Sequence, residues 1–328
     1  MKILVIFTGG TIGSASGKKW ITLDDSTNYT LIDDYVNKEG NGVSFDAVSP
    51  YSILSENLSG SELTKLCNLL IESVKKDYDG IIVTHGTDTI QYTASAIAYT
   101  VNAKNVPILL VSANYPLEDE RTNGRVNFKA AVDFIKSKNG GGVFVSYQNA
   151  GEDKVKIHLA TSVIGHAEAM DEIHSLGGKT FAEVLDGKVF ITEKINERII
   201  NEEERKVEFT SSPNVLMINS FPGDEFNYNL DGYNAVLIKP YHSGTLNTES
   251  KRLAEFCEKA EEKGVPVFLT NVPSGKAYES SKTYKNLSLY VLPFCTIPSI
   301  YVKIWLAVSL KKDVKEFVLN EISGEFSN

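Results

Sequence analysis

Short apolar, β-branched runs alternate along the first half of this chain with segments whose apolar residues recur at helical spacing. Such alternation is typical of parallel βαβ units, and strands that are apolar throughout fit a sheet covered on both faces. We therefore expect strands at 2–7, 80–84, 106–113 and 142–149, with helices at 59–77, 88–101 and 126–137 between them.

The pattern changes after residue 150. The segments 154–162 and 187–200 resemble a β-hairpin region, and the charged stretch 201–213 is a candidate linker. Beyond it the alternation restarts on a smaller scale, with strands expected at 214–221, 234–241, 265–271 and 287–294, and helices at 249–264, 297–311 and 313–322. This predicts a large amino-terminal parallel-sheet α/β domain at 1–200, a linker at 201–213 and a smaller carboxy-terminal α/β domain at 214–328.

Composition excludes several classes of partner. The 328 residues carry a formal net charge of −9, whereas binding to a polyanion needs clustered Lys and Arg, so we expect no nucleic-acid partner. No apolar run is long enough for a membrane span or a signal-peptide core, and we expect a cytoplasmic protein without a membrane contact. The three cysteines, Cys67, Cys257 and Cys295, have neither disulfide-framework nor metal-site spacing.

Two glycine- and threonine-containing turns follow predicted strands: "TGGTIGS" at 8–14 and "VTHGTDT" at 83–89. Ligands of open α/β sheets bind beyond the carboxyl ends of the strands, so both turns are expected at one crevice. Taken alone, Thr11 is a turn residue and Asp88 a helix cap. Taken together, the turns bring two hydroxyls and a carboxylate to one place, where a threonine nucleophile needs a proton acceptor and inward backbone amides hold an oxyanion. Neither turn has the spacing of a phosphate-binding loop.

These two turns resemble the signature motifs of the bacterial-type L-asparaginase (asparaginase/glutaminase) family. The segments "NYT" at 28–30 and "LSENLSG" at 54–60 also resemble the family's tyrosine and substrate-binding segments. The resemblance implies a two-domain α/β fold and hydrolysis of L-asparagine to L-aspartate and ammonia through an acyl-enzyme. It implies no metal or organic cofactor, and a homodimer or homotetramer with sites at subunit contacts.

Residue roles follow from the same resemblance. Thr11 would be the nucleophile, Tyr29, on a loop that closes over the site, would assist proton transfer, and Thr87 would activate or orient the attacking group. Asp88 and Glu56 would bind the α-ammonium group of the amino-acid substrate, and Ser55 its α-carboxylate. Such a substrate carries one positive and one negative group, which require carboxylates and hydrogen-bond donors in the same crevice.

One family feature has no clear counterpart. The family usually presents a lysine on a hairpin near the second threonine, and the segment 152–162 is shorter here. One alignment places His158 at that position and another places Lys156 there. His85 is expected to fix its own turn by a backbone hydrogen bond. His166 and His174 fall in a segment without a clear alignment. The loop 242–247 either supplies a residue to the site of a neighbouring subunit, as the resemblance implies, or is an ordinary strand-to-helix loop.

Two other functions remain open. The same motifs occur in the glutaminase subunit of a tRNA-dependent amidotransferase, although such relatives carry an extra amino-terminal domain and this chain begins at its first strand. A binding protein that retains the pocket but has lost turnover is the third hypothesis. Asparagine and glutamine differ by one methylene group, which a pocket distinguishes by only about 1–3 kcal/mol, so the sequence leaves the preference open.

Overall fold

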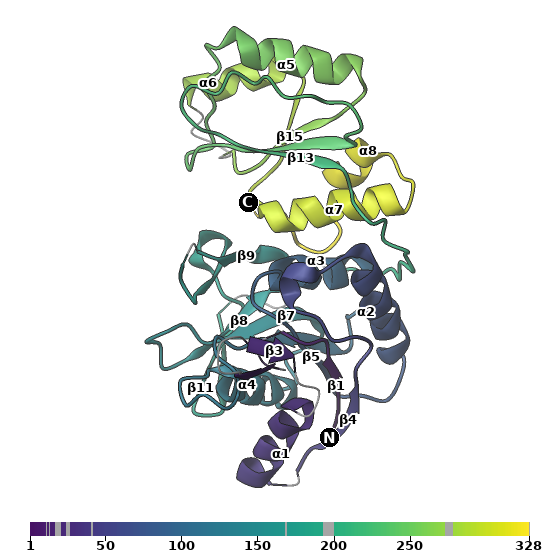
Figure 1. Ribbon diagram of the computed structural model, residues 1–328, viewed down its shortest axis with the longest axis vertical. Helices are drawn as coiled ribbons and strands as arrows, with labels where there is room; N and C mark the ends of the chain where they lie inside the picture. The colour runs from purple at the N-terminus through teal and green to yellow at the C-terminus, as the bar shows by residue number, and fades with distance from the viewer. Residues whose placement is uncertain are drawn as a thin grey trace.

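The computed structural model describes residues 1–10, 12, 14–16, 21–23, 27–40, 42–167, 169–192, 200–272 and 278–327. Two layered α/β assemblies make up this part of the chain (Figure 1). An eight-stranded, mainly parallel sheet comes from the first half and a four-stranded parallel sheet from the second. The fold class predicted from the sequence is confirmed.

The large sheet has the strand order β12-β11-β8-β7-β6-β5-β1-β4. Five neighbouring strands are parallel, so that their carboxyl ends meet at one edge, and the last three are antiparallel. In chain order the strands are β1 (Lys2–Phe7), β4 (Ser44–Val48), β5 (Gly80–Thr84), β6 (Pro107–Val111), β7 (Gly142–Tyr147), β8 (Val155–Leu159), β11 (Ala182–Leu185) and β12 (Lys188–Ile191).

Helices cover both faces of the parallel part of this sheet, which is why the central strands β1, β5, β6 and β7 are mostly apolar. Helices α2 (Gly60–Ser73) and α3 (Ile90–Thr100) pack on one face, while α1 (Thr27–Glu39) and α4 (Gly124–Lys136) pack on the other. Successive residues of one strand enter different cores: Ile81 belongs to the α2–α3 side and Ile82 to the α1–α4 side.

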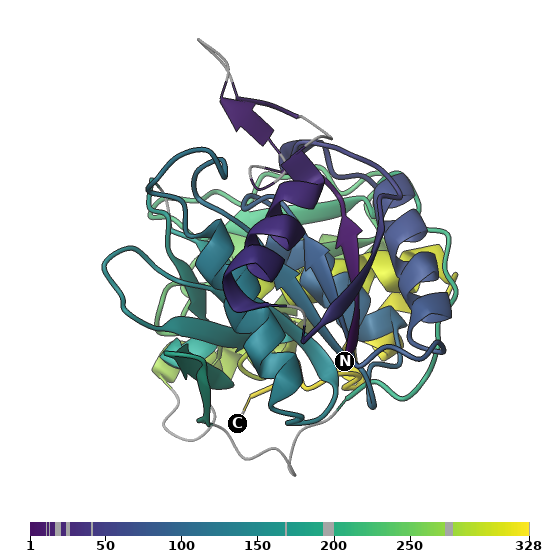
Figure 2. The same ribbon diagram turned by 90° about the horizontal axis from the view of Figure 1, so that it is seen from below.

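Strand β4 and helix α1 are among the elements of the large α/β assembly that lie outside the predicted pattern. Strand β4 forms the edge beside β1, and helix α1 buries Leu31 and Tyr35 against α4. Polar residues interrupt both segments, and the few apolar residues that remain show neither the helical nor the strand periodicity on which the sequence prediction depends. Figure 2 shows α1 across the sheet and the β2–β3 hairpin (Ser14–Ser16 and Ile21–Leu23) extending away from the body of the molecule.

The second half forms the sheet β13-β14-β15-β16, and its strands lie where the sequence predicts them. Its elements are β13 (Val215–Asn219), β14 (Ala235–Lys239), α5 (Lys251–Glu262), β15 (Val267–Leu269), α6 (Glu279–Lys282), β16 (Leu289–Val291), α7 (Ile297–Ser309) and α8 (Val314–Leu319). Helix α5 buries Leu253, Phe256, Cys257 and Ala260, the face expected from their spacing.

Helix α7 packs against both assemblies, whereas the sequence assigned the terminal helices to the second alone. It lies between the small sheet and α3 (Figure 1). Trp305 and Leu306 belong to the core of the large sheet, and Ile300 and Ile304 to that of the small sheet. The Trp305 indole also donates a 2.9 Å hydrogen bond to the Thr210 carbonyl, which ties the segment between the sheets to this helix.

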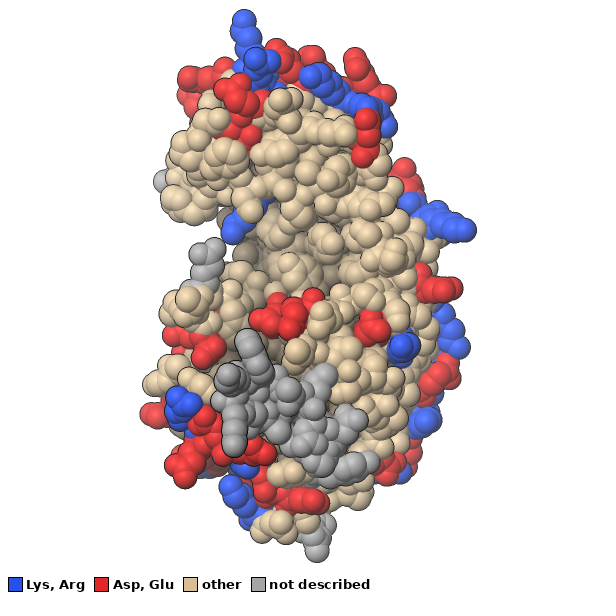
Figure 3. All heavy atoms as spheres, viewed as in Figure 1, with Lys and Arg blue, Asp and Glu red and all other residues tan. Residues whose placement is uncertain are grey.

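Charged groups are interspersed over the face seen in Figure 3, where Lys and Arg form no broad field. Within the described residues, no helix is both long enough and apolar enough to span a bilayer. In the same part of the chain, no three His, Cys, Asp or Glu residues are grouped as metal ligands would be.

Candidate active site

The two glycine- and threonine-containing turns contact each other through their backbones. A Cβ atom added to Gly10 would lie 2.3 Å from the Gly86 nitrogen, and Gly10 has a φ of +77°, a conformation that side chains disfavour. A Cβ on Gly86 would in turn lie 2.4 Å from the Ser55 Oγ. Glycine is therefore required at both positions, because the turns and Ser55 occupy the space that side chains would fill.

Hydrogen bonds at the carboxyl edge of the sheet hold this arrangement. The Gly10 amide donates to the Ile53 carbonyl at 2.9 Å, and the Ile53 amide donates to the Thr8 carbonyl at 3.1 Å. The Thr8 hydroxyl donates to the Thr84 carbonyl at 2.6 Å and so links the end of β1 to the end of β5. The segment that carries Ser55 is thus fixed beside both turns.

Ser55 and Asp88 form the polar centre that the structure describes. The Ser55 hydroxyl donates to Asp88 Oδ2 at 3.4 Å, and the Thr89 hydroxyl donates to the Ser55 carbonyl at 2.9 Å. Ser55 is buried, whereas Asp88 is exposed and available to a ligand. Asp88 does not cap the following helix: the N-cap of α3 is Thr89, which makes no side-chain capping bond. Glu56 is exposed, and its carboxylate bonds to none of the described residues.

The other predicted site residues differ in how far they are described. Thr87 is partly exposed, and its hydroxyl makes no hydrogen bond to a described residue. Thr11 lies outside the described residues, next to Gly10. The Tyr29 backbone belongs to helix α1, which corrects the expectation of a loop, and its side chain is outside the described part of the structure.

His85 fixes its turn, as the sequence predicts. Its Nδ1 is 2.8 Å from the Gly86 carbonyl oxygen, and its Nε2 is 2.9 Å from the Thr93 hydroxyl. Burial lowers the pKa of His85 to about 4, so the ring is neutral at pH 7. Its two hydrogen bonds connect the turn to α3, and the His85 side chain is buried.

Lys156 and His158 share one face of β8 but have different surroundings. Across the sheet Lys156 pairs with Tyr147 and His158 with Val145, so Lys156 is nearer the carboxyl end of β7. Lys156 forms a 2.5 Å ion pair with Glu152. His158 is 1% exposed and lies 2.7 Å from the Ser175 hydroxyl, and burial lowers its pKa to about 3. Neither residue is hydrogen-bonded to Thr87.

Sequence reasoning missed a hairpin beside the site, formed by β9 (Val163–His166) and β10 (Ile173–Ser175). Asn149 anchors it, because its side chain donates to the Ile173 carbonyl at 3.2 Å and accepts from the Ile173 amide at 2.9 Å. The His166 ring lies 5.5 Å from the Tyr147 ring, edge to face. Gly165, which follows the apolar residues 163 and 164, is the sequence signal for a strand that approaches another backbone or side chain closely.

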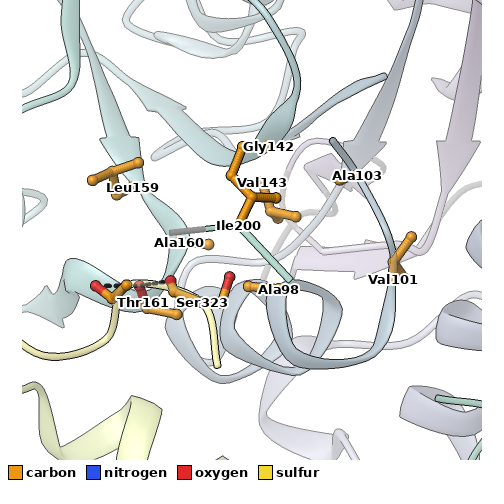
Figure 4. A pocket seen from close by; sticks show the side chains of 11 residues that line it. Ala98, Val101, Ala103, Gly142, Val143, Leu159, Ala160, Thr161, Ile200 and Ser323 are labelled. Atoms are coloured by element: carbon orange, nitrogen blue, oxygen red, sulfur yellow. Dashed lines mark hydrogen bonds between the residues drawn. The ribbon is translucent and has the colours of Figure 1, made fainter. Parts of the chain in front are cut away.

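A cavity of about 30 Å³ lies elsewhere in the fold (Figure 4). Its lining includes Ala98 and Val101 at the end of α3, and Gly142 at the start of β7. It therefore lies toward the amino ends of the strands, opposite the edge that carries Ser55 and Asp88. The Thr161 hydroxyl closes one side by donating to the Ser323 carbonyl at 3.2 Å.

Comparison with known proteins agrees with this architecture. A family described as "Asparaginase, N-terminal" matches residues 2–198. The chain is 24% identical over 346 residues to a component of the glutamyl-tRNA(Gln) amidotransferase of Methanobrevibacter smithii, covering 99% of this chain and 77% of that protein. It is 25% identical over 278 residues to an L-asparaginase of Thermococcus kodakarensis, covering 82% and 80% of the two chains.

The fold comparison covers the whole chain. The solved structure of the thermostable L-asparaginase from Thermococcus kodakarensis aligns with a TM-score of 0.81 and 22% identity, over 100% of both chains. This establishes a shared fold, and the family match extends over more than half of the sequence. The chain therefore belongs to the asparaginase family.

Proposed function

We propose that this protein is an amidohydrolase that converts L-asparagine to L-aspartate and ammonia. The observation that carries the proposal is the backbone contact between Gly10 and Gly86, with Ser55 packed against the second glycine. Because Thr11 follows Gly10 and Thr87 follows Gly86, this contact supports two threonines acting on one small amide. The matches to an L-asparaginase and to an amidotransferase component are consistent with amide chemistry.

In the proposed reaction, the Thr11 oxygen attacks the side-chain amide carbon and ammonia leaves, which gives an acyl-enzyme. Tyr29 assists transfer of the Thr11 proton to the leaving nitrogen, because a threonine hydroxyl is a poor nucleophile until its proton is accepted. Water, oriented by Thr87, then attacks the ester and releases aspartate and the Thr11 hydroxyl. In this proposal, backbone amides of the glycine-rich turns that point into the site stabilise the negative oxygen formed in each step.

Substrate selection is proposed to depend on the polar centre. Asp88 and Glu56 bind the α-ammonium group, and Ser55 binds the α-carboxylate through its hydroxyl. The exposure of both carboxylates and the 3.4 Å contact between Ser55 and Asp88 support a shared binding region. Of the two candidates for the family's lysine, we favour Lys156, because His158 is enclosed and neutral while Lys156 is nearer the carboxyl edge of the sheet.

The test is ammonia release from asparagine, glutamine and succinamate by the purified chain. The proposal expects asparagine to be the preferred substrate, and Thr11→Ala to abolish turnover while the circular dichroism spectrum and the unfolding midpoint stay unchanged. Equal activity in Thr11→Ala and the wild type would reject the nucleophile. Aspartate binding by calorimetry without ammonia release from any substrate would favour a binding protein instead.

The second candidate is the glutaminase subunit of an amidotransferase, which the match over 99% of this chain supports. It predicts that the isolated protein releases ammonia from glutamine only with a partner that supplies the acceptor substrate. We also propose a homodimer or homotetramer in which the loop 242–247 approaches a neighbouring site. Light scattering at several protein concentrations measures the assembly, and a monomer with full activity would exclude that arrangement.

A further inference from the structure

The β9–β10 hairpin brings His166 beside the turn that carries Asp88. A Cβ atom added to Gly165 would lie 3.0 Å from the side-chain amide of Gln91, so the backbone of β9 rests on the first turn of α3. The Gln91 amide donates a 3.0 Å hydrogen bond to the Asp88 carbonyl. Gln91 thus connects the hairpin to the candidate active site, and the next residue of the hairpin is His166.

One nitrogen of His166 has no hydrogen-bond partner among the residues that the structure describes. The ring packs edge to face on Tyr147 and hydrogen-bonds the backbone of Met170, while Nε2 is shielded from solvent and bonds to no described residue. A shielded polar atom without a partner costs free energy, which a donor on a bound ligand would offset. Such an atom next to a candidate active site therefore points to a ligand contact.

The charges around the ring favour a cationic ligand group. The titratable groups whose charges act on His166 are Asp88 before α3, Asp171 in the hairpin and His174 of β10, and the Tyr147 ring of β7 packs against it. Burial lowers the pKa of His166 below its ordinary value of 6.5, so at pH 7 the ring is neutral and Nε2 can accept a hydrogen bond.

We propose that His166 is a further substrate-binding residue, whose Nε2 accepts a hydrogen bond from the α-ammonium group beside Asp88 and Glu56. This inference rests on the proposed function, because it adds a residue to the same site. An ammonium group has three donors, and two carboxylates with one imidazole nitrogen supply three acceptors. A neutral acceptor completes this set without adding a third negative charge to the site.

Three variants separate this role from packing. His166→Phe keeps an aromatic ring against Tyr147 and removes the nitrogen, and His166→Asn keeps an acceptor that does not titrate. His174→Asn is the matched control on the next strand, because His174 is exposed and pairs with Glu172 at 3.0 Å. Each variant is assayed with asparagine and with succinamate, which has the same amide and carboxylate but no ammonium group.

We expect His166→Phe to raise the KM for asparagine about tenfold, because the substrate loses one hydrogen bond to its charged ammonium group. Its kcat and its kcat/KM for succinamate should stay near wild type, as should all constants of His174→Asn. His166→Asn should recover most of the loss. In the wild type the KM for asparagine should rise as pH falls below 6.5, because a protonated ring repels the ammonium group, and this rise should be absent in His166→Asn.

Equal losses for asparagine and succinamate, or a wild-type KM in His166→Phe, would overturn the inference. If the wild type releases no ammonia, calorimetry compares aspartate with succinate as ligands. Weaker aspartate binding in His166→Phe, with no change for succinate, would then support the inference while the hydrolase proposal fails. Absence of both turnover and aspartate binding would overturn the two together.

Discussion

The contact between Gly10 and Gly86 makes Gly10→Ala the sharpest structural test. Two costs add at this position. Holding a residue with a side chain at a φ of +77° costs about 1–2 kcal/mol. The new Cβ would also lie 2.3 Å from the Gly86 nitrogen, and overpacking of this kind costs about 1–3 kcal/mol because neither backbone segment can yield locally. The expected loss in the free energy of unfolding is therefore about 2–5 kcal/mol.

Gly40→Ala is the matched control. Gly40 has a φ of +81°, and a Cβ there would meet no atom within 4 Å, so only the conformational cost applies. Urea unfolding of the two variants isolates the effect of the clash, and ammonia release measures its effect on the site. We expect Gly10→Ala to be the less stable variant and to lose most activity, while Gly40→Ala stays active. Equal stability and equal activity in the two variants would refute the close approach of the turns.

Two further predictions concern stability. Lys303 and Glu325 form an ion pair with both side chains 0% exposed, so Lys303→Met should leave the buried carboxylate without its counter-ion and lower the free energy of unfolding in urea by about 3–5 kcal/mol. Loss of the exposed Lys2–Asp46 pair in Lys2→Met should change the free energy of unfolding little. An unchanged unfolding midpoint in Lys303→Met would contradict the burial of the pair. Burial lowers the pKa of His85 to about 4, so the unfolded chain binds a proton that the folded chain does not as pH falls from 6.5 to 4, and the free energy of unfolding should fall over that range. His85→Gln should flatten this part of the stability profile, and an identical profile in the variant would refute the assignment.

The sequence was sufficient for elements whose burial is uniform. Strands β1, β5, β6 and β7 are buried along almost their whole length and are mostly apolar, with Thr84 and Ser146 as polar exceptions, so their apolar runs can be recognised without knowledge of their partners. Helix α1 and strand β4 were missed because each buries only part of its surface against neighbours distant in sequence. The double contact of α7 depends on two cores at once, which a single helical period does not reveal.

The candidate site divides in the same way. The two turns were identified from local sequence motifs, and their glycines indicated that another part of the chain or a ligand approaches the backbone closely there. The contact of Gly10 with Gly86, and the position of the segment 53–55 beside both turns, arise from pairing between strands far apart in sequence and required the fold. The β9–β10 hairpin matches no sequence motif. His166 could therefore be assigned to the candidate site only from its contact with Tyr147 and from the contact of Gly165 with Gln91 in the structure.

The most direct measurement of the central claim is the search for a covalent intermediate. Protein mixed with asparagine, quenched in acid and digested, is analysed by mass spectrometry, with Thr87→Ala included because it should slow hydrolysis of the ester. The account predicts an aspartyl ester on the peptide that contains Thr11, accumulating in Thr87→Ala and absent in Thr11→Ala. Ammonia release without such an adduct, at an undiminished rate in Thr11→Ala, would contradict it.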